Sequence, residues 1–238
     1  MKAVIFDMDD TLYDQLEPFR RAFQEHFYLE NASVNEVFKL SRKYSDEVFE
    51  LSESGEMSMD AMHIYRIRKA LEHYDYKITD SEGLAFQKSY RGYQQTIELT
   101  AGMEAALEFC VKNQLTVGVI TNGPREYQAQ KIQQLHLEKW IPKQHMIISG
   151  AVQLMKPDVK IFELAEKRME LEKEETYYVG DSFDNDIVGA NRAGWKTIWQ
   201  NRRGRVQPEG SIQSDFVIEE DEQLVPLLAK LLSESFRK

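Results

Sequence analysis

Short runs of β-branched and other apolar residues recur along this chain, and their spacing constrains the fold more than any other feature. Between the later runs lie stretches of about ten to fifteen residues with the apolar periodicity of amphipathic helices. Strands that alternate with helices are typical of a parallel sheet covered by helices on both faces. We therefore predict an α/β fold with a Rossmann-like core. Its expected strands are residues 3–6, 116–120, 146–148, 176–179, 197–199 and 215–218, and leucines at helical spacing predict a closing helix over 221–235.

One long segment interrupts this alternation. It contains no convincing strand, but it has long helical patterns such as Glu17 to Leu29 and Val34 to Leu51, and Ser33 and Ser58 stand where helix N-caps are expected. A block of about 80 residues is far too long for a connection inside an α/β unit. We therefore predict two domains: an α/β core of residues 1–14 and 99–238, and an inserted all-α domain of residues 15–98.

The composition excludes several classes of protein. A formal net charge of −10 disfavours binding to the phosphate backbone of nucleic acid. No apolar run approaches the roughly 20 residues that span a bilayer, and the apolar run directly after Met1 leaves no room for a cleavable signal peptide. The single cysteine, Cys110, fits a reducing compartment. We expect a cytoplasmic protein without a nucleic-acid or membrane partner, and we make no prediction of its oligomeric state.

Three acids directly follow the first expected strand, in the segment Asp7-Met8-Asp9-Asp10-Thr11. Asp7 and Asp9 are two residues apart, so in an extended chain their side chains project to one side. Two carboxylates held together suit either the binding of a divalent metal or the pairing of a nucleophile with a general acid. Asp10 is equally compatible with capping the next turn.

Three further expected strands or turns end in polar groups. Thr121 and Asn122 follow the second strand, where they suit either anion binding or a helix cap. Lys156 precedes Pro157 and Asp158, which we expect at the first position and in the first turn of a helix. A lysine there opposes the helix dipole unless it faces an anion. Asp181 follows the fourth strand, with Asp184 and Asp186 close behind. Because ligands bind outside the carboxyl ends of parallel strands, we expect these groups to converge.

In this combination the sequence resembles the haloacid dehalogenase superfamily, from residue 3 to the final helix. The family pattern is DxDxT after the first strand, a Thr or Ser after the second, a Lys that is often followed by Pro, and a GDxxxD-type acid motif. This chain has all of them in that order: Asp7, Asp9 and Thr11, then Thr121, Lys156, and Asp181 with Asp186. The helical insert resembles the C1 cap of that family.

The resemblance implies a role for each of these residues. Asp7 attacks phosphorus and forms an aspartyl-phosphate, while Asp9 protonates the leaving oxygen and then activates water. Thr121 and Lys156 hold the phosphoryl oxygens, with help from Asn122. The implied cofactor is Mg²⁺, bound by the side chains of Asp7 and Asp181 and by the backbone carbonyl of Asp9, with Asp186 supporting its water shell. We also expect the neighbouring charge of Asp7 to raise the pKa of Asp9, unless the metal cancels that charge, and so to make Asp9 a usable acid.

Asp9 also separates the branches of the family. The related dehalogenases and phosphonatases carry no Asp at this position, so its presence implies a phosphatase that acts on phosphate esters. Asp10 stands where many relatives have Gly, and its role is not explained by the sequence.

The substrate is implied less directly. The turn of residues 54–58, Arg66 downstream, the segment Thr121-Asn122-Gly123 and the loop Gln207-Pro208-Glu209-Gly210 resemble pyrimidine-type 5′-nucleotidases. We therefore expect a small phosphorylated metabolite, with a nucleoside 5′-monophosphate first and phosphoglycolate or a sugar phosphate as alternatives. Arg66 would contact the substrate, although it is equally compatible with a solvated helix position.

Three other readings stay open at this point. A sugar phosphomutase of the same superfamily would use the same motifs but protect the aspartyl-phosphate from water. A signalling receiver domain would need a phosphorylatable Asp at a third strand end, and here that region is residues 54–60 of the insert. A non-catalytic family member would act as a binding module, which the complete set of motifs disfavours.

Overall fold

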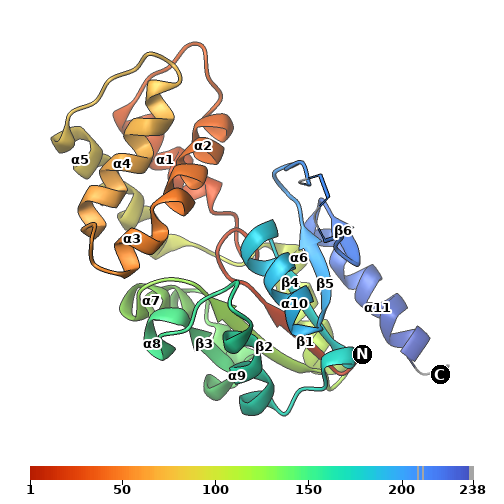
Figure 1. Ribbon diagram of the computed structural model, residues 1–238. Helices are drawn as coiled ribbons and strands as arrows, with labels where there is room; N and C mark the ends of the chain where they lie inside the picture. The colour runs from red at the N-terminus through yellow and green to blue at the C-terminus, as the bar shows by residue number, and fades with distance from the viewer. Residues whose placement is uncertain (208, 211, 236–238) are drawn as a thin grey trace. The chain divides into compact units, whose positions relative to one another are not determined.

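The computed structural model describes residues 1–207, 209–210 and 212–235, and the chain divides into two compact units (Figure 1). One unit comprises Met1–Asp14 and Glu98–Lys238, and the other comprises Gln15–Ile97. The boundaries predicted at residues 15 and 98 lie within one residue of these. We call the first the core unit and the second the helical unit, and describe each by itself.

The core unit is built on one sheet of six strands, all of them parallel, in the order β3-β2-β1-β4-β5-β6. Each predicted strand is present, with bounds that differ by at most one residue at either end. The Rossmann-like α/β fold is therefore confirmed. The strands are β1 (Ala3–Phe6), β2 (Thr116–Thr121), β3 (Met146–Ile148), β4 (Thr176–Gly180), β5 (Lys196–Gln200) and β6 (Phe216–Ile218).

Helices cover both faces of this sheet. On one face, Ile5 and Ile120 pack into a buried cluster with Ile161 and Phe162 of α9 and with Ala190 of α10. On the other face, α6 contacts β2 and α11. These helices are α6 (Ala101–Lys112), α7 (Arg125–Gln134), α8 (Ser149–Val152), α9 (Val159–Met169), α10 (Gly189–Ala193) and α11 (Leu224–Ser235); shorter turns are η2 (Leu137–Lys139), η3 (Lys143–His145), η4 (Lys173–Glu175), η6 (Asp221–Gln223) and the π-helix η5 (Phe183–Val188).

The order of the strands places a topological switch point at β1. The chain leaves β1, returns as β2 on one side of it, and later returns as β4 on its other side. Crossovers that run in opposite directions leave a crevice outside the carboxyl ends of the central strands, and ligands of such sheets bind there. The acids that follow β1 and β4 are therefore placed at this crevice.

Two expected helix starts differ from the observed ones. Pro157 lies before α9 rather than at its first position, because the side chain of Asp158 caps the helix by accepting a hydrogen bond from the backbone N–H of Lys160 at 3.0 Å. The closing helix begins at Leu224, after the short turn η6. In the described part of the chain, no helix is long and apolar enough to cross a membrane.

The helical unit contains helices and no strand among its described residues. The serine caps are confirmed: the hydroxyls of Ser33 and Ser58 accept hydrogen bonds from the backbone N–H groups of Glu36 and Ala61. The pattern expected over Val34 to Leu51 is broken at Val48, whose backbone leaves the helical region. The helices are α1 (Leu16–His26), α2 (Val34–Glu47), α3 (Phe49–Glu53), α4 (Met59–Glu72) and α5 (Asp80–Tyr93), followed by the short η1 (Gln94–Thr96).

Aromatic side chains fill the interior of this unit. Phe19 packs edge-on against Phe38, Phe86 and Tyr90, with ring centroids 5.2–5.7 Å apart. Residues 54–58 form the connection between α3 and α4. No sheet strand of the described chain ends there, so the third acid that a receiver domain needs is not supplied by this region.

Candidate active site

Lys156 joins two of the predicted acids in the core unit. Its ammonium group lies 2.6 Å from Oδ1 of Asp7 and 2.7 Å from Oδ1 of Asp186. It also donates to the hydroxyl of Tyr178 at 2.9 Å, and that hydroxyl donates to the carbonyl of Ile120 at 3.0 Å. The side chains of Lys156, Asp7 and Asp186 are all at least nine-tenths buried. Lys156 therefore offsets buried negative charge, as its place opposite an acid cluster predicted.

The strand ends hold these groups in register. The backbone N–H of Asp7 donates to the carbonyl of Val179 at 2.8 Å, so the β1–β4 pairing continues through Asp7. The hydroxyl of Thr11 donates to Oδ2 of Asp7 at 3.2 Å. Both carboxylate oxygens of Asp7 are thus held, one by Lys156 and one by Thr11, and its side chain cannot rotate freely.

Asp181 completes a group of three acids with Asp7 and Asp186. One carboxylate oxygen from each lies within 4.8 Å of the others. Three carboxylates around one point are the hard oxygen donors that Mg²⁺, Mn²⁺ or Ca²⁺ prefers, and a buried cluster of this kind would repel itself without a cation. The residues present therefore fit a divalent metal ion. The contribution expected from the backbone carbonyl of Asp9 stays a prediction.

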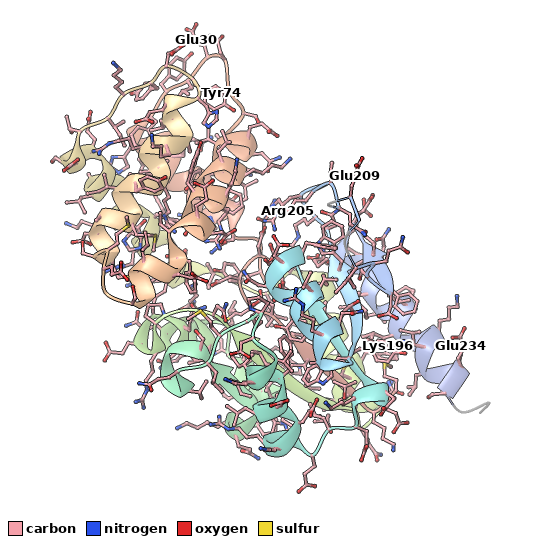
Figure 2. All side chains as sticks on the ribbon, in the orientation of Figure 1. Glu30, Tyr74, Lys196, Arg205, Glu209 and Glu234 are labelled. Atoms are coloured by element: carbon pink, nitrogen blue, oxygen red, sulfur yellow. The ribbon has the colours of Figure 1, made fainter. Side chains whose placement is uncertain are left out.

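The loop after β4 is shaped to hold the last two of these acids. A Cβ atom on Gly180 would lie 2.5 Å from the carboxyl carbon of Asp186, so only glycine fits there. Asp186 also accepts a hydrogen bond from the backbone N–H of Ser182 at 2.9 Å. Asp181 lies 3.2 Å from the guanidinium of Arg205, which belongs to the segment after β5 (Figure 2).

Burial strongly affects the protonation of this group of acids. Desolvation, together with the charges of Asp186 and Asp9, raises the pKa of Asp7 to about 7, even though Lys156 acts in the opposite direction. Desolvation also raises the pKa of Asp181 well above its usual value. Without a metal, the folded protein therefore binds protons here that the unfolded chain releases at lower pH.

This difference predicts a pH-dependent stabilisation by divalent cations. Because its pKa is raised in the folded state, Asp7 contributes stability that is full below its unfolded pKa of 3.8 and is lost as the pH rises to about 7. In the presence of a chelator, the Tm of wild type minus the Tm of Asp7→Asn should therefore decrease as the pH rises from 5 to 8. Added Mg²⁺ should raise the wild-type Tm by several degrees at pH 8 and by much less at pH 5. A stabilisation of about 1 kcal/mol shifts Tm by roughly 2–4 °C at this chain length. Thermal unfolding at the two pH values measures this; an equal metal effect at both would contradict it.

Asp9 is held apart from this group, on the side of α7. Lys131 lies 2.6 and 2.8 Å from its two carboxylate oxygens, Tyr13 donates at 2.5 Å and Gln128 at 3.0 Å. Burial alone would raise the pKa of Asp9, but the ammonium of Lys131 and these hydrogen bonds together lower it to about 2. The expectation that Asp7 raises the pKa of Asp9 was therefore wrong for the metal-free protein, because Lys131 lies much closer to Asp9 than the sequence could indicate.

Thr121 and Asn122 form hydrogen bonds with Gln128 and Lys156, respectively. The hydroxyl of Thr121 accepts a hydrogen bond from Gln128 at 2.5 Å. The side-chain amide of Asn122 bonds both the carbonyl and the N–H of Lys156, at 2.9 and 3.0 Å. Asn122 thus fixes the backbone that carries Lys156. Its direct contact with phosphate stays a prediction.

Asp10 acquires a structural explanation that the sequence lacked. Its backbone has φ +61°, a conformation that favours glycine. Its buried carboxylate accepts two hydrogen bonds from Arg203, at 3.0 and 2.5 Å, and Arg203 also pairs with Asp14. The neighbouring Arg202 donates to the carbonyls of Asp10, Thr11 and Tyr13. Two consecutive arginines therefore bind the loop that follows Asp7, and Asp10 supplies one of their contacts.

Arg66 lies in the helical unit and contacts residues of that unit. It is 8% exposed and donates to the side-chain carbonyl of Gln87 at 2.8 Å. His63, one turn earlier on α4, is buried too, and desolvation together with the charges of Arg66 and Arg91 lowers its pKa to about 3. Contact of Arg66 with a substrate stays a prediction. Of the loop 207–210 named for its resemblance to nucleotidases, Pro208 lies outside the described residues.

The site residues that the sequence did not reveal are Lys131, Gln128, Tyr13, Tyr178, Arg202, Arg203 and Arg205. Lys131 and Gln128 are three residues apart on α7, so they share one face of that helix. Both are buried. A polar pair on the inward face of a helix has no hydrophobic periodicity, so the only available signal was its position just after the strand that ends in Thr121.

The chain is similar to known proteins over most of its length. The model of the family described as "haloacid dehalogenase-like hydrolase" matches residues 1–194. Glyceraldehyde 3-phosphate phosphatase of Pyrococcus furiosus is 28% identical over 242 residues, covering 97% of this chain and 94% of its own. Pyrimidine 5′-nucleotidase YjjG of Escherichia coli is 31% identical over 121 residues, 50% of this chain and 52% of its own.

Solved structures agree on the fold. The HAD-hydrolase YfnB of Bacillus subtilis, solved bound to magnesium, superposes with a TM-score of 0.70 at 22% identity, covering 95% of this chain and 98% of its own. The matched residues include Asp7, Thr121, Lys156 and the acids after β4. This chain belongs to the haloacid dehalogenase-like hydrolases.

Proposed function

We propose that this hydrolase is a magnesium-dependent phosphatase that cleaves small phosphate monoesters through an aspartyl-phosphate on Asp7. The observation that carries the proposal is the arrangement around Asp7. Its buried carboxylate is held by Lys156 and Thr11 beside two further acids, and a second carboxyl, Asp9, lies two residues on. Glyceraldehyde 3-phosphate phosphatases that match over nearly the whole chain support the same reaction class.

The two half-reactions divide the work between Asp7 and Asp9. A carboxylate oxygen of Asp7 attacks phosphorus, the bond to the ester oxygen breaks, and Asp9 gives that oxygen a proton. Water then attacks phosphorus, Asp9 takes the proton of the water, and the bond to Asp7 breaks to release inorganic phosphate. Splitting one difficult displacement in this way gives two easier steps. The dianionic phosphoryl group, once bound, favours the protonated form of Asp9, because like charges nearby raise the pKa of a carboxyl.

Cations must offset the charge of the phosphoryl group, because the transition state is stabilised mainly through its equatorial oxygens. In a chain of net charge −10, Lys156 is placed for this, with the hydroxyl of Thr121 as a hydrogen-bond donor. Asp7, Asp181 and Asp186 would hold Mg²⁺, which supplies Lewis-acid charge to the phosphoryl oxygens. Lys156 then has a second function, since its charge opposes the rise in the pKa of Asp7 that burial causes.

For the substrate, two classes deserve a direct test. The relatives that match over 97% of this chain include glyceraldehyde 3-phosphate phosphatases and an N-acylneuraminate-9-phosphatase, whereas the pyrimidine 5′-nucleotidase matches over about half of it. A phosphorylated three-carbon sugar therefore stands beside the nucleoside 5′-monophosphate that the sequence first suggested. Phosphoglycolate is a third candidate.

A panel of phosphate esters tests the proposal. Purified protein is incubated with glyceraldehyde 3-phosphate, nucleoside 5′-monophosphates, phosphoglycolate and hexose phosphates, with Mg²⁺ or with chelator. We expect release of inorganic phosphate from at least one ester and its loss by about two orders of magnitude in chelator, as expected when a charge-stabilising group is removed. Formation of an isomerised sugar phosphate without free phosphate would instead identify a phosphomutase.

A further inference from the structure

Asp9 is enclosed by three side chains that the reaction outlined above does not use. Lys131 reaches both of its carboxylate oxygens, Tyr13 reaches one, and Gln128 reaches the other. Lys131, Gln128 and Tyr13 are each less than 5% exposed. Gln128 also donates to the hydroxyl of Thr121 and to the carbonyl of Asn122, at 2.5 and 2.8 Å. One face of α7 therefore connects the end of β1 with the end of β2.

Stability alone does not account for Lys131. Bringing an ammonium group and a carboxylate out of water costs several kcal/mol each, and a buried ion pair often contributes no more than a well-packed apolar pair would. Lys131 is 122 residues from Asp9 in sequence and comes from the helix after β2, with the ring of Tyr127 4.6 Å from its ammonium group. A buried cation whose two hydrogen bonds both go to one carboxyl is placed to act on that carboxyl.

We propose that Lys131 is a positioning residue for Asp9: together with Tyr13 and Gln128 it fixes the carboxyl group in the place from which its proton passes to the leaving oxygen. This inference rests on the proposed phosphatase function and concerns its first half-reaction. A catalytic group that is already held in its productive geometry needs no reorganisation during the step, and this lowers the barrier. Gln128 assists from the same helix face and keeps Asp9 in register with Thr121.

The leaving group distinguishes this role from a structural one. An alkyl phosphate such as glycerol phosphate must expel a poor leaving group, so its cleavage depends on the proton from Asp9. In p-nitrophenyl phosphate the leaving group departs as a stabilised anion and gains little from an acid. The parameter kcat/KM reports binding and the first half-reaction only, so it excludes the later use of Asp9 as a base.

We expect Lys131→Met to lower kcat/KM for glycerol phosphate by roughly 10- to 100-fold, a part of the 10²–10⁴ that a positioned acid contributes. For p-nitrophenyl phosphate the same variant should stay within about 3-fold of wild type, because the acid contributes little to that reaction. The matched control is Lys139→Met, which removes an exposed lysine paired with Glu104 and Glu108 and should leave both esters unchanged. If Lys131→Met does not fold, kcat/KM for the same two esters is measured on Lys131→Gln, which keeps a hydrogen-bond donor without the charge.

A double variant tests whether Lys131 acts through Asp9. Asp9→Asn should retain Mg²⁺ binding and lose most cleavage of glycerol phosphate, and adding Lys131→Met should cost less than a further 3-fold. A multiplicative loss in the double variant would mean that Lys131 contacts the substrate directly, which overturns the proposal. An equal fall of both esters in Lys131→Met would also overturn it. If wild type releases phosphate from neither ester nor from the wider panel, the phosphatase function fails instead, so the two failures are distinguishable.

Discussion

Replacing Asp7 with asparagine is expected to lower Mg²⁺-dependent phosphate release by a factor of about 10³ or more, the scale of loss seen when a covalent nucleophile is removed. The reason is chemical rather than structural. Asparagine keeps the size of the side chain and can still meet Thr11 and Lys156, which hold the two oxygens of Asp7 at 3.2 and 2.6 Å. It lacks the charged oxygen that, in the proposed mechanism, attacks phosphorus.

The measurement is the release of inorganic phosphate from the best ester of the panel, together with the trapping of covalently bound phosphate by acid quench. Wild type should yield an acid-quenched phosphoprotein and Asp7→Asn should yield none. Asp184→Asn is the matched control, because Asp184 is an exposed acid of η5. Full activity in Asp7→Asn would show that another group attacks phosphorus, and the mechanism would then be wrong.

Replacing Lys156 with methionine is expected to reduce both activity and stability. The ammonium group contacts Asp7 and Asp186, whose side chains are 8% and 1% exposed, so its loss leaves two buried carboxylates without their cation. Removing one partner of a buried ion pair typically costs about 3–5 kcal/mol. In the proposed mechanism Lys156 also offsets the charge of the phosphoryl oxygens, so its loss should lower kcat/KM by a further factor of roughly 10²–10³.

Added Mg²⁺ distinguishes the loss of stability from the loss of activity. Mg²⁺ bound at the proposed site would neutralise the same carboxylates, so it should restore much of the Tm of Lys156→Met while activity stays low. Lys160→Met is the matched control, because Lys160 is exposed on α9 and its loss should shift stability by less than about 0.5 kcal/mol. A Lys156→Met protein that is as stable as wild type in chelator would contradict the assigned charge balance. One that cleaves esters normally with Mg²⁺ would contradict its role with phosphate.

The sequence by itself determined the sheet and indicated which acids and which lysine meet at its edge. Strand bounds followed from runs of β-branched residues, because strands buried on both faces are apolar along their whole length. Asp7, Lys156 and Asp186 could be placed together because the carboxyl ends of parallel strands meet at one edge. The caps at Ser33 and Ser58 were equally legible, since capping depends on residues within one turn.

Only the tertiary structure decided how these groups are held and charged. Lys131 on a polar helix has the same local pattern whether its ammonium faces water or a carboxylate 122 residues away, so its pairing with Asp9 had no sequence signal. Asp10 could not be explained because its φ of +61° and its contact with Arg203 both depend on the loop after β5. The predicted rise in the pKa of Asp9 was wrong for the same reason. A pKa reflects the charges nearest in space, and the charge nearest to Asp9 comes from another element of the fold.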